Sequence, residues 1–173
     1  VGPVGIVQMG TGGVRAGRQM QEAGKRIFEE GFKFLVAEET KEGKREAANA
    51  AIGARDKDGN WVVPEVPQSL SYVAKEAYEP IARKRYIDSL ALELDLEAKK
   101  IAAKHERDPE GFNTEYGTFL DGVRDKLKDT EFVGSVESIG LTNSRQYQNA
   151  LFIDQVNFDD KIAAANAVQI LDK

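Results

Sequence analysis

Glycines near the N-terminus have the first spacing in this chain that could support chemistry. Gly10, Gly12 and Gly13 follow the short apolar segment Val4–Val7. A dinucleotide-binding turn needs the pattern Gly-x-Gly-x-x-Gly after a strand, because the backbone must come close to a pyrophosphate. Arg15 occupies the third glycine position, and no Gly-Lys-Ser or Gly-Lys-Thr marks a phosphate loop. We therefore expect no nucleotide cofactor.

A second candidate is the acidic turn that begins at Asp56. Asp56, Asp58 and Asn60 place side-chain oxygens at the first, third and fifth positions of a calcium-binding loop. That loop also needs glycine at its sixth position and glutamate at its twelfth. This chain has Trp61 and Pro67 there. The pattern indicates a polar turn that binds no metal.

The chain has a single histidine, His105, and no cysteine. A zinc site or a nucleophile–histidine pair needs further ligands or a partner group of these kinds. The histidine stands near the end of an expected helix, where a cation suits the helix dipole. We predict a surface histidine without a catalytic or metal-binding role.

Carboxylates are abundant, but their spacing supports no reaction. Paired acids can hydrolyse glycosides, and glutamates on facing helices can hold two iron ions. Glu93 and Glu97 are four residues apart, yet no Glu-x-x-His motif accompanies them. The acids alternate with Lys and Arg, as they do on solvated helix faces. We predict that these residues form no enzyme; a catalytic domain elsewhere in a longer chain stays open.

Composition excludes further function classes. The 173 residues carry a formal net charge of −5, with 41% hydrophobic and 31% charged residues. Acidic and basic residues interleave, whereas a nucleic-acid-binding face needs clustered Lys and Arg. We expect no specific nucleic-acid recognition. No apolar run approaches the ~20 residues that span a bilayer, so we predict no transmembrane segment.

Periodicity and helix-breaking residues predict a mainly α protein, an elongated bundle or hairpin of three to four long helices. An irregular glycine-rich segment over 1–13 precedes a helical region over 14–127. The expected helices span about 14–52, 68–106 and 109–127, with a short hairpin-like or extended connector near 54–67. Pro80 should kink or split the second helix. Residues 128–173 should form a link, over 129–142, and a final helix from Asn143 or Ser144 that continues into further chain.

The first long helix carries the most unusual pattern. Gly17, Gly24 and Gly31 are seven residues apart, and Met20, Ile27 and Phe34 repeat at the same interval. Each glycine costs about 1 kcal/mol relative to alanine inside a helix, which suggests a packing reason. The face can pack against the second helix or against another subunit, and both interpretations stay open. The predicted packing or interface residues are Gly17, Met20, Gly24, Ile27, Phe28, Gly31, Phe34 and Leu35.

The order of short motifs over residues 4–127 resembles the N-terminal regions of the internal, or ejection, proteins of tailed bacteriophages. An apolar Val-Gly-Ile-Val segment leads into a Gly-Gly-Val-x-Ala-Gly stretch and a long charged helix. A turn with Pro-x-x-Pro then opens a helix with Ala-Tyr and Arg-Tyr pairs, and an Asp-Pro-x-x-Phe element follows. These motifs stand at Val4–Val7, Gly12–Gly17, Pro64–Pro67, Ala77–Tyr78, Arg85–Tyr86 and Asp108–Phe112.

The resemblance implies a structural component of the virion, located in the capsid interior or tail and expelled with the genome into the host envelope. It implies a homo-oligomer and contacts with portal, tail or core proteins. The main alternative is a non-viral, cytoplasmic adaptor or scaffold that binds a partner helix with the same glycine face. A third possibility is an enzyme fragment whose active site lies outside these residues.

Overall fold

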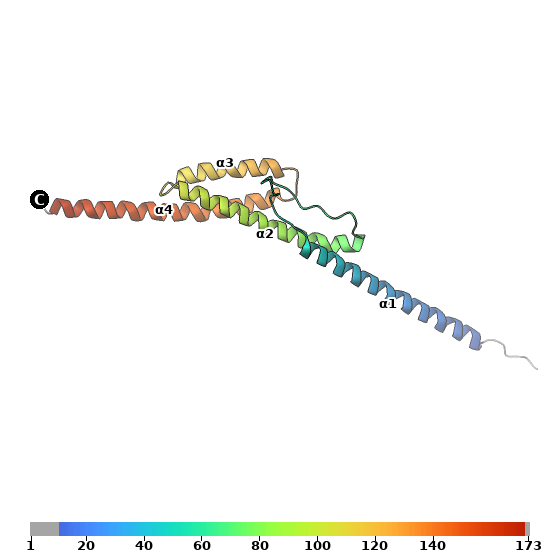
Figure 1. Ribbon diagram of the computed structural model, residues 1–173. Coiled ribbons are helices and arrows are strands. Elements are labelled where there is room, and N and C mark those ends of the chain that lie inside the picture. The colour runs from blue at the N-terminus through green and yellow to red at the C-terminus, as the bar shows by residue number, and fades with distance from the viewer. Residues whose placement is uncertain (1–10, 172–173) are drawn as a thin grey trace, which may run out of the picture.

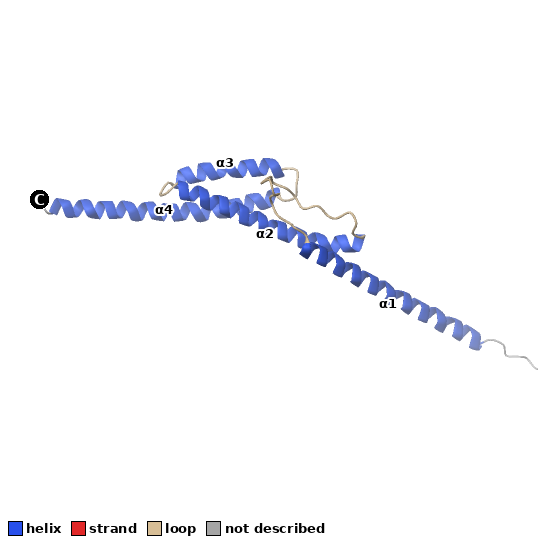
Figure 2. Ribbon diagram, in the orientation of Figure 1, coloured by secondary structure: helices blue, strands red, loops and turns tan. Residues whose placement is uncertain are grey.

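The computed structural model describes residues 11–171, and the side chains of residues 17–167. Four helices make up the described chain: α1 (Thr11–Asn49), α2 (Tyr72–Lys104), α3 (Pro109–Leu127) and α4 (Val133–Leu171). The part of the chain so described contains no strand (Figure 2). The predicted mainly α fold is confirmed. The irregular segment predicted for 1–13 lies outside the described residues, apart from residues 11–13, which begin α1.

The molecule is elongated, with α2 along its middle (Figure 1). Helices α2, α3 and α4 pack on one another, whereas α1 packs on α2 alone among the described helices. The first half of α1 and the second half of α4 extend from the centre at opposite ends. The core is therefore short relative to the helices that build it.

One line of side chains along α2 forms the spine of the core. These residues recur at every fourth position from Ala74 to Ala98. Because four residues exceed one turn by about 40°, the line winds gradually around α2. Aromatic and leucine side chains gather towards α3 and α4, and alanines gather towards α1. The buried residues of α2 are Ala74, Tyr78, Ala82, Tyr86, Leu90, Leu94, Ala98 and Ile101.

Small residues let α1 and α2 come into contact at their backbones. A Cβ atom on Gly43 would clash with the backbone carbonyl of Ala74, so glycine is required at this crossing. Ala47 is also fully buried there. Arg85 of α2 then closes the end of α1, because its Nη1 donates to the backbone oxygens of Ala48 and Ala50, both at 2.9 Å. Such carbonyls at a helix end have no partner within the helix.

The connector between α1 and α2 spans residues 50–71 and contains one tight turn. Gly59 has a φ of +84°, which favours glycine. One antiparallel bridge joins Arg55 to Trp61. Helix α2 starts at Tyr72 rather than at 68, because the Ser71 side chain caps it by accepting from the Ala74 backbone N–H at 3.2 Å.

Helix α2 runs unbroken through Pro80. Of the two outcomes predicted for Pro80, a kink or a split, the split into two helices is wrong. Proline removes one helical hydrogen bond and costs about 3 kcal/mol in a helix interior. Tyr78 and Ala82, on either side of it, are both buried. Tertiary packing along this stretch offsets the local cost.

Helix α3 begins where the sequence predicts. Asp108 caps it by accepting a hydrogen bond from the Gly111 backbone N–H at 2.9 Å, and Pro109 occupies the first turn. Proline suits that position because its missing N–H would have no helical partner anyway. The predicted bounds 109–127 are those of the structure.

Helix α4 begins ten residues before the predicted start at Asn143. Residues 133–142 of the predicted link are helical. Gly140 lies against α3, where an added Cβ would come within 2.7 Å of Leu120 Cδ1. Asn143 is 6% exposed, and its Nδ2 donates to the Tyr116 hydroxyl at 3.1 Å. Glycine and asparagine indicate a helix boundary locally, but here they serve close packing and a buried hydrogen bond.

Candidate interaction surface

The first half of α1 projects beyond the core, and over residues 17–35 no other described part of the chain packs on it. Every residue over 17–35 is exposed, and we call this segment the α1 arm. Exposed apolar patches of this kind mark interaction surfaces. Six large apolar side chains of the arm are 60–78% exposed: Met20, Ile27, Phe28, Phe32, Phe34 and Leu35.

The apolar residues of the arm share one side of the helix. Because residues seven apart nearly align on an α-helix, the glycines form a central line that we call the glycine seam (Gly17, Gly24 and Gly31). Met20, Ile27 and Phe34 border the seam on one side. Aromatic residues border it on the other, where the Phe28 and Phe32 rings stack with centroids 6.4 Å apart. The charged residues occupy the rest of the circumference, as in an amphipathic helix.

The glycine seam faces open space within the described chain. A Cβ added at Gly17, Gly24 or Gly31 would meet nothing within 4 Å. The interpretation that this face packs against the second helix is therefore wrong. The structure does bring all eight predicted interface residues onto one side of one segment. Their contact with another subunit stays a prediction.

Phe32 belongs to this surface, although the sequence analysis did not select it. It lies outside the seven-residue repeat, at the edge of the apolar side, and is 60% exposed. Its signal was the spacing of four residues from Phe28, which places both on neighbouring turns. The apolar side is therefore wider than the repeat alone indicated.

The second half of α4 also projects from the core, but its apolar residues are spread around the helix. Phe152 and Val156 share one side, and Phe158 and Ile162 share another. The four are 41–57% exposed. Phe158 has a partner, since the Arg107 guanidinium lies 3.9 Å from its ring centroid. This segment presents no single apolar face comparable to that of the α1 arm.

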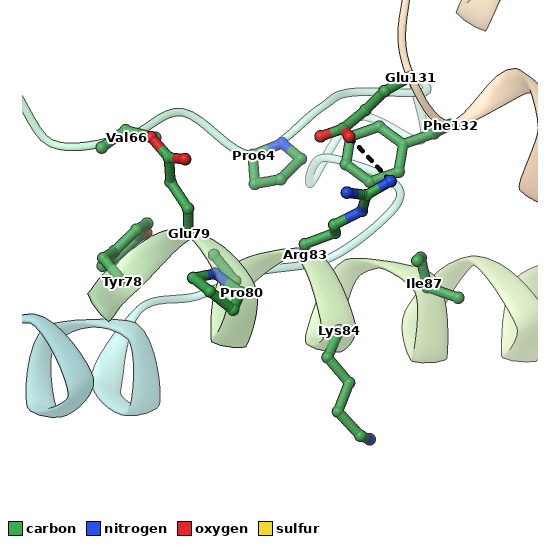
Figure 3. A pocket seen from close by; sticks show the side chains of 11 residues that line it. Pro64, Val66, Tyr78, Glu79, Pro80, Arg83, Lys84, Ile87, Glu131 and Phe132 are labelled. Atoms are coloured by element: carbon green, nitrogen blue, oxygen red, sulfur yellow. Dashed lines mark ion pairs between the residues drawn. The ribbon is translucent and has the colours of Figure 1, made fainter. Parts of the chain in front are cut away.

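A cleft of about 670 Å³ lies where the connector crosses α2 (Figure 3). Its apolar lining includes Pro64, Pro80 and Phe132. An ion pair spans it, since Arg83 Nη2 lies 2.9 Å from Glu131 Oε2. The charges of this pair compensate each other, and Glu79 and Lys84 also line the cleft. No local pattern predicts the cleft, because its walls come from three distant segments of the chain.

His105 links the end of α2 to α3. Its Nε2 lies 2.7 Å from Glu115 Oε2, and its Nδ1 lies 3.5 Å from Asp108 Oδ2. The hydrogen bond to Glu115 is the main reason that the pKa of His105 is raised above its ordinary value. Lys104 and then His105 lower the pKa of Glu115. With its side chain 24% exposed, the predicted surface histidine is a half-buried structural link between two helices.

The acidic turn at Asp56 is closed by its own hydrogen bonds. Asp56 Oδ1 accepts from the backbone N–H groups of Asp58 and Asn60, both at 2.9 Å. The Asn60 side chain is the largest cause of the lowered pKa of Asp56. This carboxylate stabilises the turn, in agreement with the interpretation of the segment as a polar turn.

Over residues 17–167, no group of three or more His, Cys, Asp and Glu side chains is placed to hold a metal ion. None of the four helices, within their described residues, has an apolar stretch long enough to cross a bilayer. No protein-family model, curated protein or solved structure matches the chain.

Proposed function

We propose that the chain is a structural segment of a bacteriophage particle, an internal or ejection protein that assembles through the α1 arm and supports delivery of the genome into the host. One observation carries the assembly role: six large apolar side chains of the arm are 60–78% exposed on one side of a helix. Fully burying one such side chain contributes about 1.5–3 kcal/mol. In an isolated chain these side chains stay in contact with water, whereas assembly would bury them and gain this free energy.

The glycine seam supports a helix as the partner of the arm. Glycine inside an exposed helix costs about 1 kcal/mol relative to alanine. The described part of the single chain offers no compensation, since a Cβ added at any of the three glycines would meet none of its atoms within 4 Å. Close approach of a second helix would supply it, because glycine leaves room for the partner's large side chains.

The assignment to a virion rests on the resemblance of the motif order over residues 4–127. The elongated form, in which helices extend at both ends of a short core, suits a segment that joins neighbours in a larger assembly. Contacts with portal, tail or core proteins, and ejection into the host envelope, belong to this proposal.

Two measurements test the proposal together. Mass spectrometry of purified phage particles should detect the protein, and light scattering after size-exclusion chromatography should give a mass above that of one chain. A variant in which Ile27 and Phe34 are replaced by Ser should lose the assembled form and be missing from particles. A compact monomer that is absent from particles would contradict the proposal.

A helical adaptor or scaffold that binds a partner helix is the second candidate. The mixed charges of the arm favour it over a nucleic-acid or membrane role, since Arg18, Lys25 and Lys33 interleave with Glu22 and Glu29. An adaptor would use the same apolar face of the arm, but it would be located in the host cytoplasm instead of the phage particle. Recovery of the protein from host cytoplasm with a cellular partner, and not from particles, would favour the adaptor.

A further inference from the structure

We infer that the partner of the α1 arm is the α1 arm of a second copy, packed antiparallel, with a two-fold axis between Lys25 and Arg26. The inference rests on the proposed assembly role of the arm, but not on its place in a virion. It names the occupant of the seam, the orientation and the register. Each of these follows from the order of large and small residues along the arm.

The large residues and the glycines of the arm are symmetric about one point. Ile27 and Gly24 lie equally far from the midpoint between Lys25 and Arg26. The same is true of Gly31 and Met20. Phe34 and Gly17 form the third such pair. An antiparallel copy centred on this point therefore places every large residue of the repeat opposite a glycine of the partner.

The alternation of large residues and glycines suits the packing layers of an antiparallel helix pair. In such a pair, a glycine position of the repeat on one helix faces a large-residue position of the repeat on its partner. Each layer here combines one glycine with one large side chain: Gly17 with Phe34, Met20 with Gly31, and Gly24 with Ile27. The layers therefore have similar volumes, and the two helices can stay evenly spaced along their length.

A parallel pair in register would pack poorly. Glycine would face glycine in one layer, which leaves a void, and Phe34 would face Phe34 in another, which crowds the seam. Voids and overpacking both destabilise an interface. The two helices would need different separations at neighbouring layers. The antiparallel arrangement removes this conflict.

The aromatic side of the arm adds to the antiparallel interface. Phe28 and Leu35 follow the glycine seam by four positions and so border it. Rotation about the two-fold axis brings the same residues of the partner to the same side of the pair. The result is an apolar border made by both copies. If the six exposed side chains were all covered, each copy would bury on the order of 700 Å², close to the ~800 Å² per partner of stable interfaces.

The cores of the two copies do not obstruct this pairing. Val36, Glu39 and Thr40 of α1 are partly buried, and the first buried residue of α1 among the described side chains is Gly43. It lies about 17 residues from the two-fold axis, or roughly 26 Å along the helix. The two cores would therefore stand roughly 50 Å apart along the pair, at opposite ends of the joined arms. All seam residues stay accessible, since residues 17–35 are exposed.

Cysteine cross-linking tests orientation and register directly, because the natural chain contains no cysteine. We expect a mixture of the Gly17→Cys and Phe34→Cys proteins to form a mixed disulfide under mild oxidation. Neither protein alone should cross-link, since Gly17 and its own copy would lie about 25 Å apart. A disulfide needs Cα atoms about 4–7 Å apart. A Gly17→Cys protein that cross-linked to itself would overturn the antiparallel register.

A swap of side chains tests the same layers without oxidation. Gly24→Ile alone should raise the dimer dissociation constant at least about tenfold, as expected for ~1.4 kcal/mol of overpacking. The double variant Gly24→Ile with Ile27→Gly should restore association, because each layer again combines one glycine with one isoleucine. Gly122→Leu on α3 is the matched control, since Gly122 also faces open space. Light scattering should show that this control associates like the natural protein.

Failure of the inference can be told apart from failure of the proposed function. A chain that is monomeric at all concentrations and forms no mixed disulfide would overturn self-pairing. If that monomer still entered phage particles, and Ile27→Ser with Phe34→Ser prevented its entry, the arm would have another virion protein as its occupant. The proposed assembly role would then stand without the antiparallel pair. Failure of the double variant to restore association would also count against the register.

Discussion

The two halves of α1 both contain glycine but have opposite surroundings. In the second half, Gly43 brings the backbone of α1 against Ala74 of α2, and Ala47 is fully buried. In the first half, Gly24 and Gly31 face open space. The comparison shows that glycine in a long helix marks places where another backbone can approach. It does not show whether that backbone belongs to the same chain.

The largest expected loss of stability is at Gly43, the glycine that packs against α2. Gly43→Ala should destabilise the fold by about 3 kcal/mol, because the new Cβ clashes with backbone rather than with a side chain that can move. Chemical unfolding followed by circular dichroism measures this. Gly31→Ala is the matched control on the same helix, with nothing within 4 Å of the new atom. Equal losses of stability for both variants would contradict the contrast between the halves.

The next largest effect is expected on assembly, at the exposed Gly24. Gly24→Leu should not lower the unfolding midpoint of the monomer, since a Cβ at this position meets no described atom within 4 Å and leucine favours a helix more than glycine does. It should weaken assembly by about 1–3 kcal/mol through overpacking against the partner. Sedimentation over a range of concentrations separates the two effects. Normal assembly of this variant would show that the seven-residue repeat is incidental.

Helix existence could be predicted from the sequence, because long amphipathic patterns and caps are local signals. The start of α3 at Pro109 was predicted from Asp108 and Pro109, and the structure has it there. The start of α4 was misplaced because Gly140 and Asn143 act through contacts with α3. Such contacts depend on residues far away in the chain. No local pattern could distinguish a packing glycine from a helix-ending one.

The residues of the α1 arm surface could be predicted from the sequence, but the part of α1 that packs on α2 could not. The eight predicted interface residues could be selected because a repeat of seven residues nearly matches two helical turns. That the second half of α1, and not the arm, packs on α2 could not be predicted. It depends on Gly43 lying beside Ala74 and on Arg85 reaching the end of α1. Neither Gly43 nor Arg85 belongs to the repeat.

Arg85 offers a smaller test of the covered half. Arg85→Met should cost about 1–3 kcal/mol, because it leaves the last carbonyls of α1 without donors while keeping most of the side-chain volume. Hydrogen exchange should become faster near Ala47 and unchanged in α3. Lys84→Met on the neighbouring exposed position is the control. Equal effects of the two variants would mean that the Arg85 hydrogen bonds contribute little.

The smallest effect should come from pH, through His105 at the end of α2 remote from α1. Its folded pKa is raised above the ordinary value of 6.5 by Glu115, with Asp108 and Lys104 as the other charged neighbours. The stabilising contribution is therefore complete below the unfolded pKa and is lost as pH rises through the folded pKa. His105→Gln should be less stable than the natural protein in mildly acidic solution, and the difference should shrink above neutral pH. Thermal unfolding of both proteins across this range measures it, and a difference independent of pH would contradict the link. Since His105 lies outside α1, association of the arms should not follow the same pH profile.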